Sequence, residues 1–450
     1  MPTVETIVAT ATPPGRGAIA VVRLSGPAAD GILARLSGAP APPPRCLRRA
    51  ILRRPGGSDA GGFIDDALVV RFPAPKSYTG EDVVELHLHG GPLVVREALD
   101  AVLACGARAA QPGEFTLRAF LNGRMDLVQV EGVAGIIDAM SPAALEAAGR
   151  QVSGRAGDFL GVLQDRLRDL LVRLEADLDF PEDVPELPRN RLAADLGELG
   201  RRLAKLAGSF DASAAIRRGL RVVLAGPPNV GKSALFNALV GHPRALVTGE
   251  PGTTRDYLEE TVLLERTPVV LVDTAGLREA VGAAEREGVR RTHEQLEQAD
   301  LVLRVVDRSD PAGAPDAPAG PEEILVLNKA DLPAAEGWPE ALDGDPGVQV
   351  VSAKTGDGLD GLIRAITARL EHRMPRMEAD DLWLVSVRQR DGVARAAALL
   401  EGAAEGVPSL PEEIIAGEIH AALDALAGVT GRRYDDHVLD RIFEDFCIGK

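Results

Sequence analysis

The chain has 450 residues, of which 45% are hydrophobic and 26% are charged, and its formal net charge is −17. This length is more than one hydrophobic core usually serves, so two to three domains are expected. The composition is typical of a globular protein, and no apolar run reaches the roughly 20 residues that a membrane-spanning helix needs. So acidic a surface repels phosphate backbones, which argues against non-specific nucleic-acid binding by the chain as a whole.

Two features of the sequence bear on its compartment. Residues 1–12 lack the basic stretch and apolar core of a secretory signal. Cys46, Cys105 and Cys447 lie far apart, which excludes a closely spaced zinc motif and argues against a disulfide framework. A reducing environment fits best, so we predict a cytoplasmic protein with no membrane span.

Residues 1–120 predict a compact α+β domain. Residues 19–23 and 83–89 have the composition or alternation of strands, and residues 67–72 form another apolar run. Residues 93–105 predict a helix packed on that sheet.

A helical pattern follows in residues 121–216 and returns in residues 373–450. Leucines recur mostly three or four residues apart between Leu160 and Leu178, and the prolines within residues 181–185 then end this helix. Further helices are expected at residues 192–216, 391–405 and 412–426. We expect the two parts to pack together as one discontinuous helical bundle.

Residues 217–372, between the two helical parts, have a different pattern of apolar residues. Short apolar runs begin at Val222, Val269, Leu301, Ile324 and Val348, with helical stretches between them. Near-continuous apolar strands that alternate with helices indicate a mainly parallel sheet covered on both faces. The expected architecture is therefore multidomain, with an α/β domain inserted into the helical bundle.

The first apolar run of the insert leads into a phosphate-binding motif. Residues 226–233 read G-x-x-x-x-G-K-S between a strand and a helix, a context that a chance glycine-rich turn does not usually show. The glycines let backbone N–H groups wrap phosphates, and the helix adds its positive N-terminal end. Lys232 can reach the outer phosphates, and Ser233 can bind Mg²⁺.

Further elements follow in the order typical of a guanine-nucleotide domain. Thr254, in a candidate switch loop, would sense the γ-phosphate through Mg²⁺, and Asp273 can hold the metal's water shell. Asp331 can accept from both guanine N1–H and the exocyclic amine, which adenine cannot supply together. The predicted GTP-binding residues are Asn229, Val230, Gly231, Lys232, Ser233, Ala234, Thr248, Gly249, Glu250, Pro251, Gly252, Thr253, Thr254, Asp273, Thr274, Ala275, Gly276, Asn328, Lys329, Asp331, Ser352, Ala353 and Lys354.

One position departs from small Ras-like GTPases. Leu277 follows residues 273–276, where those proteins carry a glutamine that orients water. Leucine cannot do so, and hydrolysis therefore needs another polar residue, another positive charge, or both.

The chain resembles the MnmE (TrmE) family of tRNA-modification GTPases over essentially its whole length. The most specific segments are residues 11–17, 77–82, 112–115, 119–122 and 447–450, to which the GTPase motifs add. The resemblance implies an N-terminal domain, residues 1–120, that dimerises and binds 5-formyl- or methylene-tetrahydrofolate. It also implies a K⁺-stimulated GTPase that hydrolyses GTP to GDP and phosphate while its GTPase domains dimerise.

The resemblance further implies partners and a product. The homodimer would join an FAD-containing protein, MnmG (GidA), in a heterotetramer. Together they would add a carboxymethylaminomethyl-type group to C5 of the wobble uridine of certain tRNAs.

Catalytic roles in the GTPase domain also follow from the resemblance. Asn229 would ligate K⁺ beside the phosphates, and the cation would neutralise charge on the transferring phosphoryl group. Glu285 would place the attacking water, although a solvated switch-helix charge is the alternative for this residue. The implied catalytic residues are Glu285, Lys232 and Asn229; the implied Mg²⁺ ligands are Ser233 and Thr254; the implied K⁺ ligands are Asn229, Thr248, Glu250 and Thr253.

The resemblance places the folate on Arg23, Glu81, Arg124 and Lys450. A carboxylate such as Glu81 suits the amino-amide edge of a pterin, and cations suit the glutamate tail. Cys447 is either a nucleophile or a packing residue. His87 and His89 share one strand face, but a zinc site needs three or four ligands, which favours structural roles for both.

A different class of function, a ribosome-assembly GTPase acting as an RNA-binding switch, shares the nucleotide motifs. Such proteins typically carry a basic RNA-binding module, whereas this chain has a net charge of −17. A purely structural scaffold would not need Lys232, Ser233 and Asp273. The sequence therefore favours the tRNA-modification enzyme.

Overall fold

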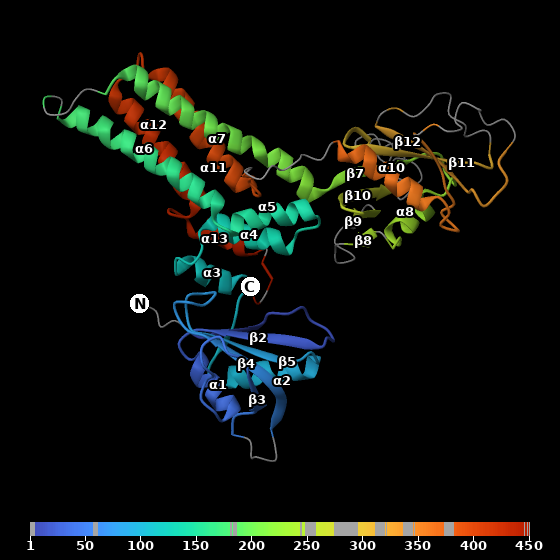
Figure 1. Cartoon of the computed structure of the whole chain (residues 1–450), viewed down its shortest axis with the longest axis horizontal. Helices are drawn as coiled ribbons and strands as arrows, with labels where there is room; N and C mark the ends of the chain where they lie inside the picture. The colour runs from blue at the N-terminus through green and yellow to red at the C-terminus, as the bar shows by residue number, and fades with distance from the viewer. Residues whose placement is uncertain are drawn as a thin grey trace, which may run out of the picture. The chain divides into compact units, whose positions relative to one another are not determined.

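The computed structural model of the chain describes residues 5–56, 62–180, 182, 187–243, 245–247, 258–273, 296–310, 320, 322–335, 345, 347–372, 382–444, 446–447 and 449 (Figure 1). The chain divides into two compact units. One comprises Met1–Ala134, Gln151–Leu203 and Asp391–Lys450, and the other comprises Gly135–Arg150 and Ala204–Arg390. Among the described residues, no helix has the length and hydropathy to cross a membrane.

The first unit begins with a sheet whose strand order is β3-β4-β5-β2-β1-β6. Its strands are β1 (Ile7–Thr10), β2 (Ile19–Ser25), β3 (Arg48–Arg53), β4 (Phe63–Phe72), β5 (Val83–His89) and β6 (Arg108–Ala109). All neighbours are antiparallel except β1 and β6. The two-residue period of β5 buries Val84, Leu86 and Leu88 in one core with residues of α1 (Ala29–Ser37) and α2 (Pro92–Ala104). The predicted strands at residues 19–23 and 83–89 and the predicted helix at 93–105 are confirmed.

Helices make up the rest of this unit. They include α3 (Glu114–Leu121), α6 (Arg155–Asp179), α12 (Glu412–Thr430) and α13 (Asp436–Glu444), and also residues 127–134 of α4 (Leu127–Ile137), 189–203 of α7 (Arg189–Arg218) and 391–406 of α11 (Val387–Gly406). The predicted leucine stripe of α6 is buried at Leu160, Leu163, Leu167, Leu171 and Leu174, and α6 ends directly before Phe180 and Pro181.

Helices that precede the insert pack on helices that follow it, as Figure 1 shows for α6 beside α12. Gly200 of α7 lies so close to α11 that an added Cβ would stand 2.9 Å from Glu401 Cγ. Arg189 at the start of α7 also donates to the carbonyl of Val407, at 2.9 Å. The predicted discontinuous bundle is therefore present within the first unit.

The second unit contains a sheet with the order β13-β12-β11-β7-β10-β9-β8. Its strands are β7 (Leu220–Ala225), β8 (Ala245–Val247), β9 (Leu258–Leu264), β10 (Thr267–Asp273), β11 (Leu301–Asp307), β12 (Glu323–Asn328) and β13 (Val348–Val350). Five neighbouring strands run parallel, namely β13, β12, β11, β7 and β10. Strands β9 and β8 add an antiparallel edge. Buried residues of α8 (Lys232–Val240) and α10 (Leu359–Glu371) share one core with these strands. The predicted mainly parallel sheet is confirmed; its antiparallel edge was not predicted.

Candidate functional site

The phosphate loop of the second unit is shaped by two glycines. Gly226, directly after β7, has a φ of 147°, and an added Cβ would stand 2.1 Å from the carbonyl oxygen of Val305. Gly231 has a φ of 94°, and its Cβ would stand 2.4 Å from Asn328 Nδ2. Neither position accommodates a side chain. The loop can therefore press against the ends of β11 and β12 before it enters α8.

Lys232 and Ser233 begin α8 at the mouth of this loop. The Nζ atom of Lys232 donates to the carbonyl oxygens of Gly226 at 3.0 Å and Pro227 at 2.8 Å. Ser233 Oγ donates to Asp273 Oδ2 at 2.6 Å, and Asp273 is fully buried at the end of β10. A hydroxyl and a carboxylate thus meet beside the phosphate loop, and hard oxygen ligands of this kind suit Mg²⁺.

Asn328, at the end of β12, joins the phosphate loop to the loop after β13. Its Nδ2 donates to the carbonyl of Val230 at 2.8 Å, and its Oδ1 accepts from the amide of Ala353 at 3.0 Å. The side chain is buried, so both bonds are shielded from water. Asn328 therefore fixes the distance between the two loops that the sequence assigns to the two ends of the nucleotide.

Asp331 lies on the side assigned to the base. Its Oδ1 accepts from Ser352 Oγ at 2.8 Å, and Lys354 Nζ stands 3.9 Å from its Oδ2. Among the described residues, the contact to Oδ2 is this long, exposed ion pair, so Oδ2 is the oxygen better placed to accept from a ligand.

Asp307, at the end of β11, is a site residue that was not predicted from the sequence. Its carboxylate accepts from Lys329 Nζ at 2.6 Å, and Lys329 itself has a φ of 63°. Burial opposes the ionisation of Asp307, but hydrogen bonds from Lys329 and Ser309 outweigh it and hold the pKa of this carboxyl below its ordinary value. The sequence held one signal for Asp307: an acidic residue stands at the carboxyl end of a parallel strand, and the neighbouring strand ends in Asn328.

Several predicted site residues lie outside the described part of the chain. Asn229 is described, exposed in the phosphate loop with a φ of 64°. The predicted residues outside the described part of the chain are Thr248, Gly249, Glu250, Pro251, Gly252, Thr253, Thr254, Thr274, Ala275, Gly276, Glu285 and Lys450.

The residues assigned to folate lie in the N-terminal domain. The guanidinium of Arg23 is bonded to Glu85 Oε1 at 2.9 Å and stands 5.5 Å from the centre of the Tyr78 ring. Glu81 Oε2 accepts from Ser25 Oγ at 2.7 Å, and Ser25 lies two residues beyond Arg23 on β2. Residues 23 and 25 therefore face the same side of the sheet.

Arg124 and the C-terminal segment approach the same region. An added Cβ at Gly80, beside Glu81, would stand 3.2 Å from Arg124 Cγ. An added Cβ at Gly449 would stand 2.1 Å from the carbonyl oxygen of Thr10 on β1, so the segment that precedes Lys450 lies against this sheet. The three described residues of the predicted folate site, Arg23, Glu81 and Arg124, therefore lie near β1, β2 and the loop before β5.

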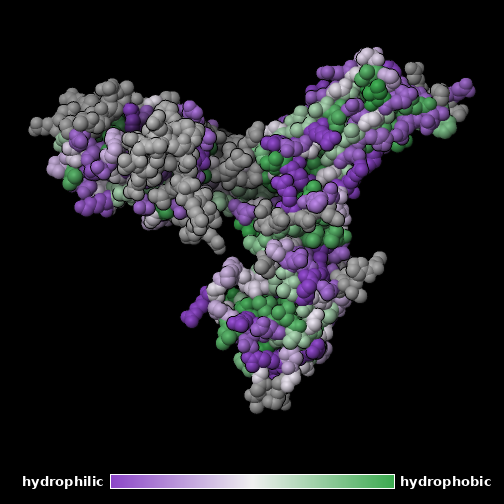
Figure 2. Space-filling view, turned by 180° about the vertical axis from the view of Figure 1, so that it is seen from behind, coloured by the Kyte–Doolittle hydropathy of each residue, from purple (hydrophilic) through white to green (hydrophobic). Residues whose placement is uncertain are grey.

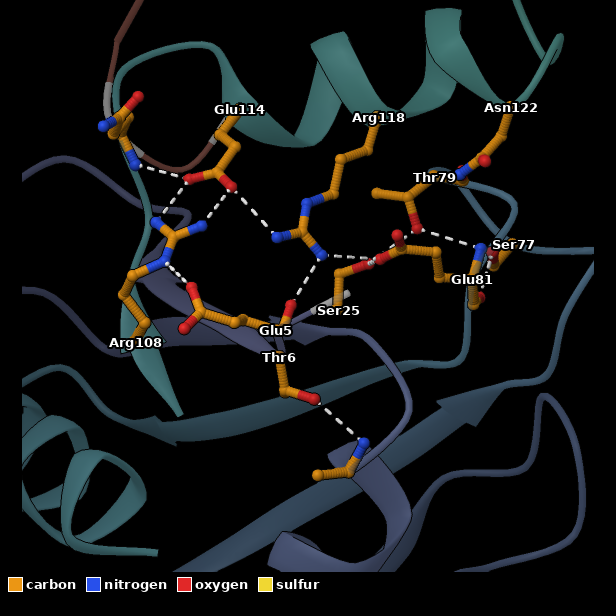
Figure 3. Close-up of polar contacts among 12 residues, drawn as sticks. Glu5, Thr6, Ser25, Ser77, Thr79, Glu81, Arg108, Glu114, Arg118 and Asn122 are labelled. Atoms are coloured by element: carbon orange, nitrogen blue, oxygen red, sulfur yellow. Dashed lines mark hydrogen bonds and ion pairs between the residues drawn. The ribbon is translucent and has the colours of Figure 1, made fainter. Parts of the chain in front are cut away.

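A chain of alternating charges adjoins Glu81 and was not anticipated from the sequence (Figure 3). Arg118 NH1 donates to Glu81 Oε2 at 3.0 Å, and its NH2 donates to Glu114 Oε1 at 2.9 Å. Arg108 forms two further bonds to Glu114, at 2.7 and 2.9 Å. Burial opposes the ionisation of Glu114, but bonds from Arg108, the Gln111 amide and Arg118 outweigh it and hold its pKa at about 2.

The two histidines on β5 pair with carboxylates. His89 Nδ1 is 2.7 Å from Asp65 Oδ1, and His87 Nε2 is 3.2 Å from Glu85 Oε2. Within the described residues, no group of three or more potential metal ligands occurs. These contacts fit the structural role favoured for both histidines. Cys447 is exposed, and its carbonyl accepts from the amide of Gly113 at 3.4 Å.

The parallel sheet, its phosphate loop and the polar side chains at its strand ends define a P-loop GTPase domain, here inserted into a helical bundle. Comparison with protein-family models matches residues 127–447 to the MnmE helical domain and residues 6–124 to the N-terminus of the GTP-binding protein TrmE. The chain belongs to the MnmE family, as the sequence resemblance implied.

Curated relatives match along their full length. The chain is 42% identical over 458 residues to the tRNA modification GTPase MnmE of Syntrophotalea carbinolica, with 99% of each chain covered. It is 43% identical over 459 residues to the tRNA modification GTPase MnmE of Symbiobacterium thermophilum, again with 99% of each covered.

Proposed function

We propose that this protein hydrolyses GTP to GDP and phosphate and uses this cycle in tRNA modification. The observation that carries the proposal is the hydrogen bond between Ser233 and Asp273, because it brings the two predicted metal-site side chains together beside the phosphate loop. Lys232 would exchange its loop carbonyls for the outer phosphates, and Thr254 would complete the Mg²⁺ site. The bound Mg²⁺ would neutralise phosphate charge.

Guanine selection rests on Asp331, Asn328 and the loop after β13. The Asp331 carboxylate would accept from guanine N1–H and the exocyclic amine. The Asn328 bonds to Val230 and Ala353 support this proposal, since they hold the base side and the phosphate side in register. Lys329 would cover the ring, and a backbone N–H of residues 352–354 would reach guanine O6.

Hydrolysis itself is proposed to depend on K⁺ and on Glu285. Asn229 would ligate K⁺ together with Thr248, Glu250 and Thr253, and Glu285 would place the attacking water in the absence of a glutamine at position 277. GTPase domains of two copies would face each other during hydrolysis, which orders these loops.

The N-terminal domain is proposed to bind 5-formyl- or methylene-tetrahydrofolate, which supplies the one-carbon unit. The described residues fit such a ligand: Glu81 presents a carboxylate for the pterin edge, and Arg23 and Arg124 present cations for the glutamate tail, joined by Lys450. The guanidinium of Arg23 lies 5.5 Å from the centre of the Tyr78 ring, which places an aromatic side chain beside the proposed site.

We further propose the domain boundaries and a homodimer. The domains would be residues 1–120 (folate binding and dimerisation), 121–216 with 373–450 (helical) and 217–372 (GTPase). Apolar side chains gather on the visible face of the N-terminal domain (Figure 2), and Ile19, Ile51, Phe63 and Leu68 of its sheet are exposed, which supports a homodimer through this domain.

The remaining partners are proposed from the family alone. The FAD-containing MnmG would join the homodimer in a heterotetramer in the cytoplasm. The product would be a carboxymethylaminomethyl-type group on C5 of the wobble uridine of certain tRNAs.

A ligand-dependent thermal shift tests this function. We expect the midpoint of unfolding to rise with 5-formyl-tetrahydrofolate and, separately, with GTP and Mg²⁺. A rise with GTP alone, with no response to the folate, would instead favour an RNA-binding switch of the ribosome-assembly class.

A further inference from the structure

Glu81, the proposed partner of the pterin, is held through one of its two oxygens. Oε2 accepts from Ser25 Oγ at 2.7 Å and from Arg118 NH1 at 3.0 Å. Every hydrogen bond that the Glu81 carboxylate receives from the described residues ends on this atom, and the side chain is 16% exposed. Oε1 receives no hydrogen bond from the described residues, so it is the oxygen left to accept from a ligand.

Arg118 is the cation that fixes this arrangement. Its guanidinium donates to three acceptors: Glu81 Oε2, Glu114 Oε1 and the backbone carbonyl of Glu5, the last at 2.9 Å (Figure 3). The planar fork of a guanidinium can meet acceptors in several fixed directions at once, whereas the single ammonium of lysine cannot hold the same geometry. With 11% of its side chain exposed, Arg118 has little freedom to turn away.

The same helix also holds the loop that carries Glu81. Asn122, which ends α3, donates from Nδ2 to the carbonyl of Thr79 at 2.7 Å, and Ser77 Oγ donates to the carbonyl of Glu81. Gly80 has a φ of 81°, and an added Cβ would stand 3.1 Å from Asn122 Cβ. The backbone of this loop and the carboxylate it bears are therefore both fixed by α3.

We propose that Arg118 is a positioning residue for the folate site: it holds Oε2 of Glu81 so that Oε1 faces the amino-amide edge of a pterin. This inference rests on the proposed folate function. Arg108 and Glu114 hold Arg118 in place, because two bonds from Arg108 orient the Glu114 carboxylate that accepts from Arg118. The alternation of charge also places a cation beside the half-buried carboxylate of Glu81 and the buried carboxylate of Glu114.

A double-mutant cycle on the full chain separates positioning from a general structural role. We would measure 5-formyl-tetrahydrofolate affinity for the wild type, Arg118→Met, Glu81→Gln and the double variant. If Arg118 acts through Glu81, Arg118→Met alone weakens binding roughly tenfold or more, but it costs less than about threefold once Glu81 is Gln. Equal losses in both backgrounds would overturn the proposal.

Conservative and matched variants guard against loss of folding. Arg118→Lys keeps the charge without the fork, and we expect its affinity to lie between those of Arg118→Met and the wild type. Arg71→Met removes a comparable ion pair, that with Asp30 at 2.6 Å in the same domain, and should leave folate affinity unchanged. GTP affinity, measured in each variant, should stay at the wild-type value.

A measurement without folate distinguishes failure of this inference from failure of the proposed function. The losses in thermal midpoint for Arg118→Met and Glu81→Gln should be non-additive in the free protein, because the two side chains form one pair. Non-additive midpoints with no folate binding by the wild type would refute the folate function and leave the pair intact. Additive midpoints, or folate binding with an additive affinity cycle, would refute the positioning role.

Discussion

Ser233 Oγ and Asp273 Oδ2 stand 2.6 Å apart, so the first turn of α8 is joined to the end of β10. The hydroxyl donates and the carboxylate accepts, so the oxygen lone pairs of Ser233 remain available to a metal ion. An aspartate in this position orients a metal ligand and the water around the metal.

Asp273→Asn should therefore raise the Mg²⁺ concentration needed for half-maximal GTP hydrolysis by about 10- to 100-fold, as expected when an outer-shell carboxylate is lost. Mg²⁺ titrations of steady-state hydrolysis measure this. Asp300→Asn is the matched control, because Asp300 lies in the same domain but bonds the amide of Arg221, at 2.8 Å. An unchanged Mg²⁺ requirement in Asp273→Asn would remove this carboxylate from the metal site.

Asp331→Asn should move nucleotide preference from GTP toward XTP. The amide presents a donor where the carboxylate accepted, and xanthine offers a carbonyl in place of the exocyclic amine. Competition binding with GTP, XTP and ATP measures the change. Full retention of the preference for GTP over XTP would show that Asp331 does not read the base.

Glu81→Ala should weaken folate binding and leave GTP affinity unchanged. Loss of a charge-assisted hydrogen bond typically costs about 1.5–3 kcal/mol, or roughly tenfold to a hundredfold in affinity. Isothermal calorimetry is the measurement, and Glu97→Ala, which removes a surface partner of Arg54, is the control. Glu81 would be excluded from the site by an affinity equal to that of the control.

Glu114 makes the stability of the N-terminal domain depend on pH. Its pKa is about 2, against an ordinary value of 4.5, so the folded state favours the ionised form. The resulting stabilisation is fully present above pH 4.5 and is lost as the pH falls toward 2. We estimate it at about 2 kcal/mol after solvent screening.

Glu114→Gln should accordingly be less stable than the wild type at pH 7, and this difference should shrink as the pH falls below 4.5. Urea denaturation at pH 7 and at pH 3.5 measures both free energies of unfolding. A difference that stays constant across this range would assign the loss to packing rather than to charge.

GTP hydrolysis should be much faster in KCl than in NaCl at equal ionic strength. A cation beside the phosphates that discriminates by size and dehydration cost would replace the positive charge of an arginine finger. Asn229→Ala should abolish this preference while nucleotide binding persists, because the backbone loop and Lys232 remain. Equal wild-type rates in the two salts would contradict the cation mechanism.

Glu285→Ala should slow turnover with little change in GTP affinity. That pattern is expected when an interaction is made mainly in the transition state. Single-turnover hydrolysis and equilibrium nucleotide binding measure the two quantities separately. A variant with wild-type turnover would favour the alternative, a solvated switch-helix charge.

Local patterns predicted those parts of the fold that short-range physics determines. The alternation of β5 and the leucine spacing of α6 each report one buried face, and the phosphate loop is contiguous in sequence. The antiparallel edge of β8 and β9 was missed, since pairing between strands is a long-range choice that neither strand's composition states.

For the site, too, the sequence predicted single residues but not the contacts between residues that lie far apart in the chain. Asn328 was assigned to the nucleotide from its place after an apolar strand, but its two bonds to Val230 and Ala353 join segments far apart in the chain. The pair of Arg118 and Glu81 is separated by 37 residues, and nothing in the spacing of either residue indicates the other.

The most direct test of the account is reconstitution of the modification. The purified chain, the proposed FAD-containing partner, GTP, Mg²⁺, K⁺, glycine as the source of the carboxymethylamino part, unmodified tRNA and a tetrahydrofolate carrying a ¹³C one-carbon group would be incubated, and the tRNA nucleosides analysed by mass spectrometry. The account predicts a ¹³C-labelled carbon bonded to C5 of the wobble uridine with the wild type, with less label for Asp273→Asn at limiting Mg²⁺ and for Glu81→Ala at limiting folate. GTP hydrolysis that proceeds without any label in the wobble uridine would contradict it.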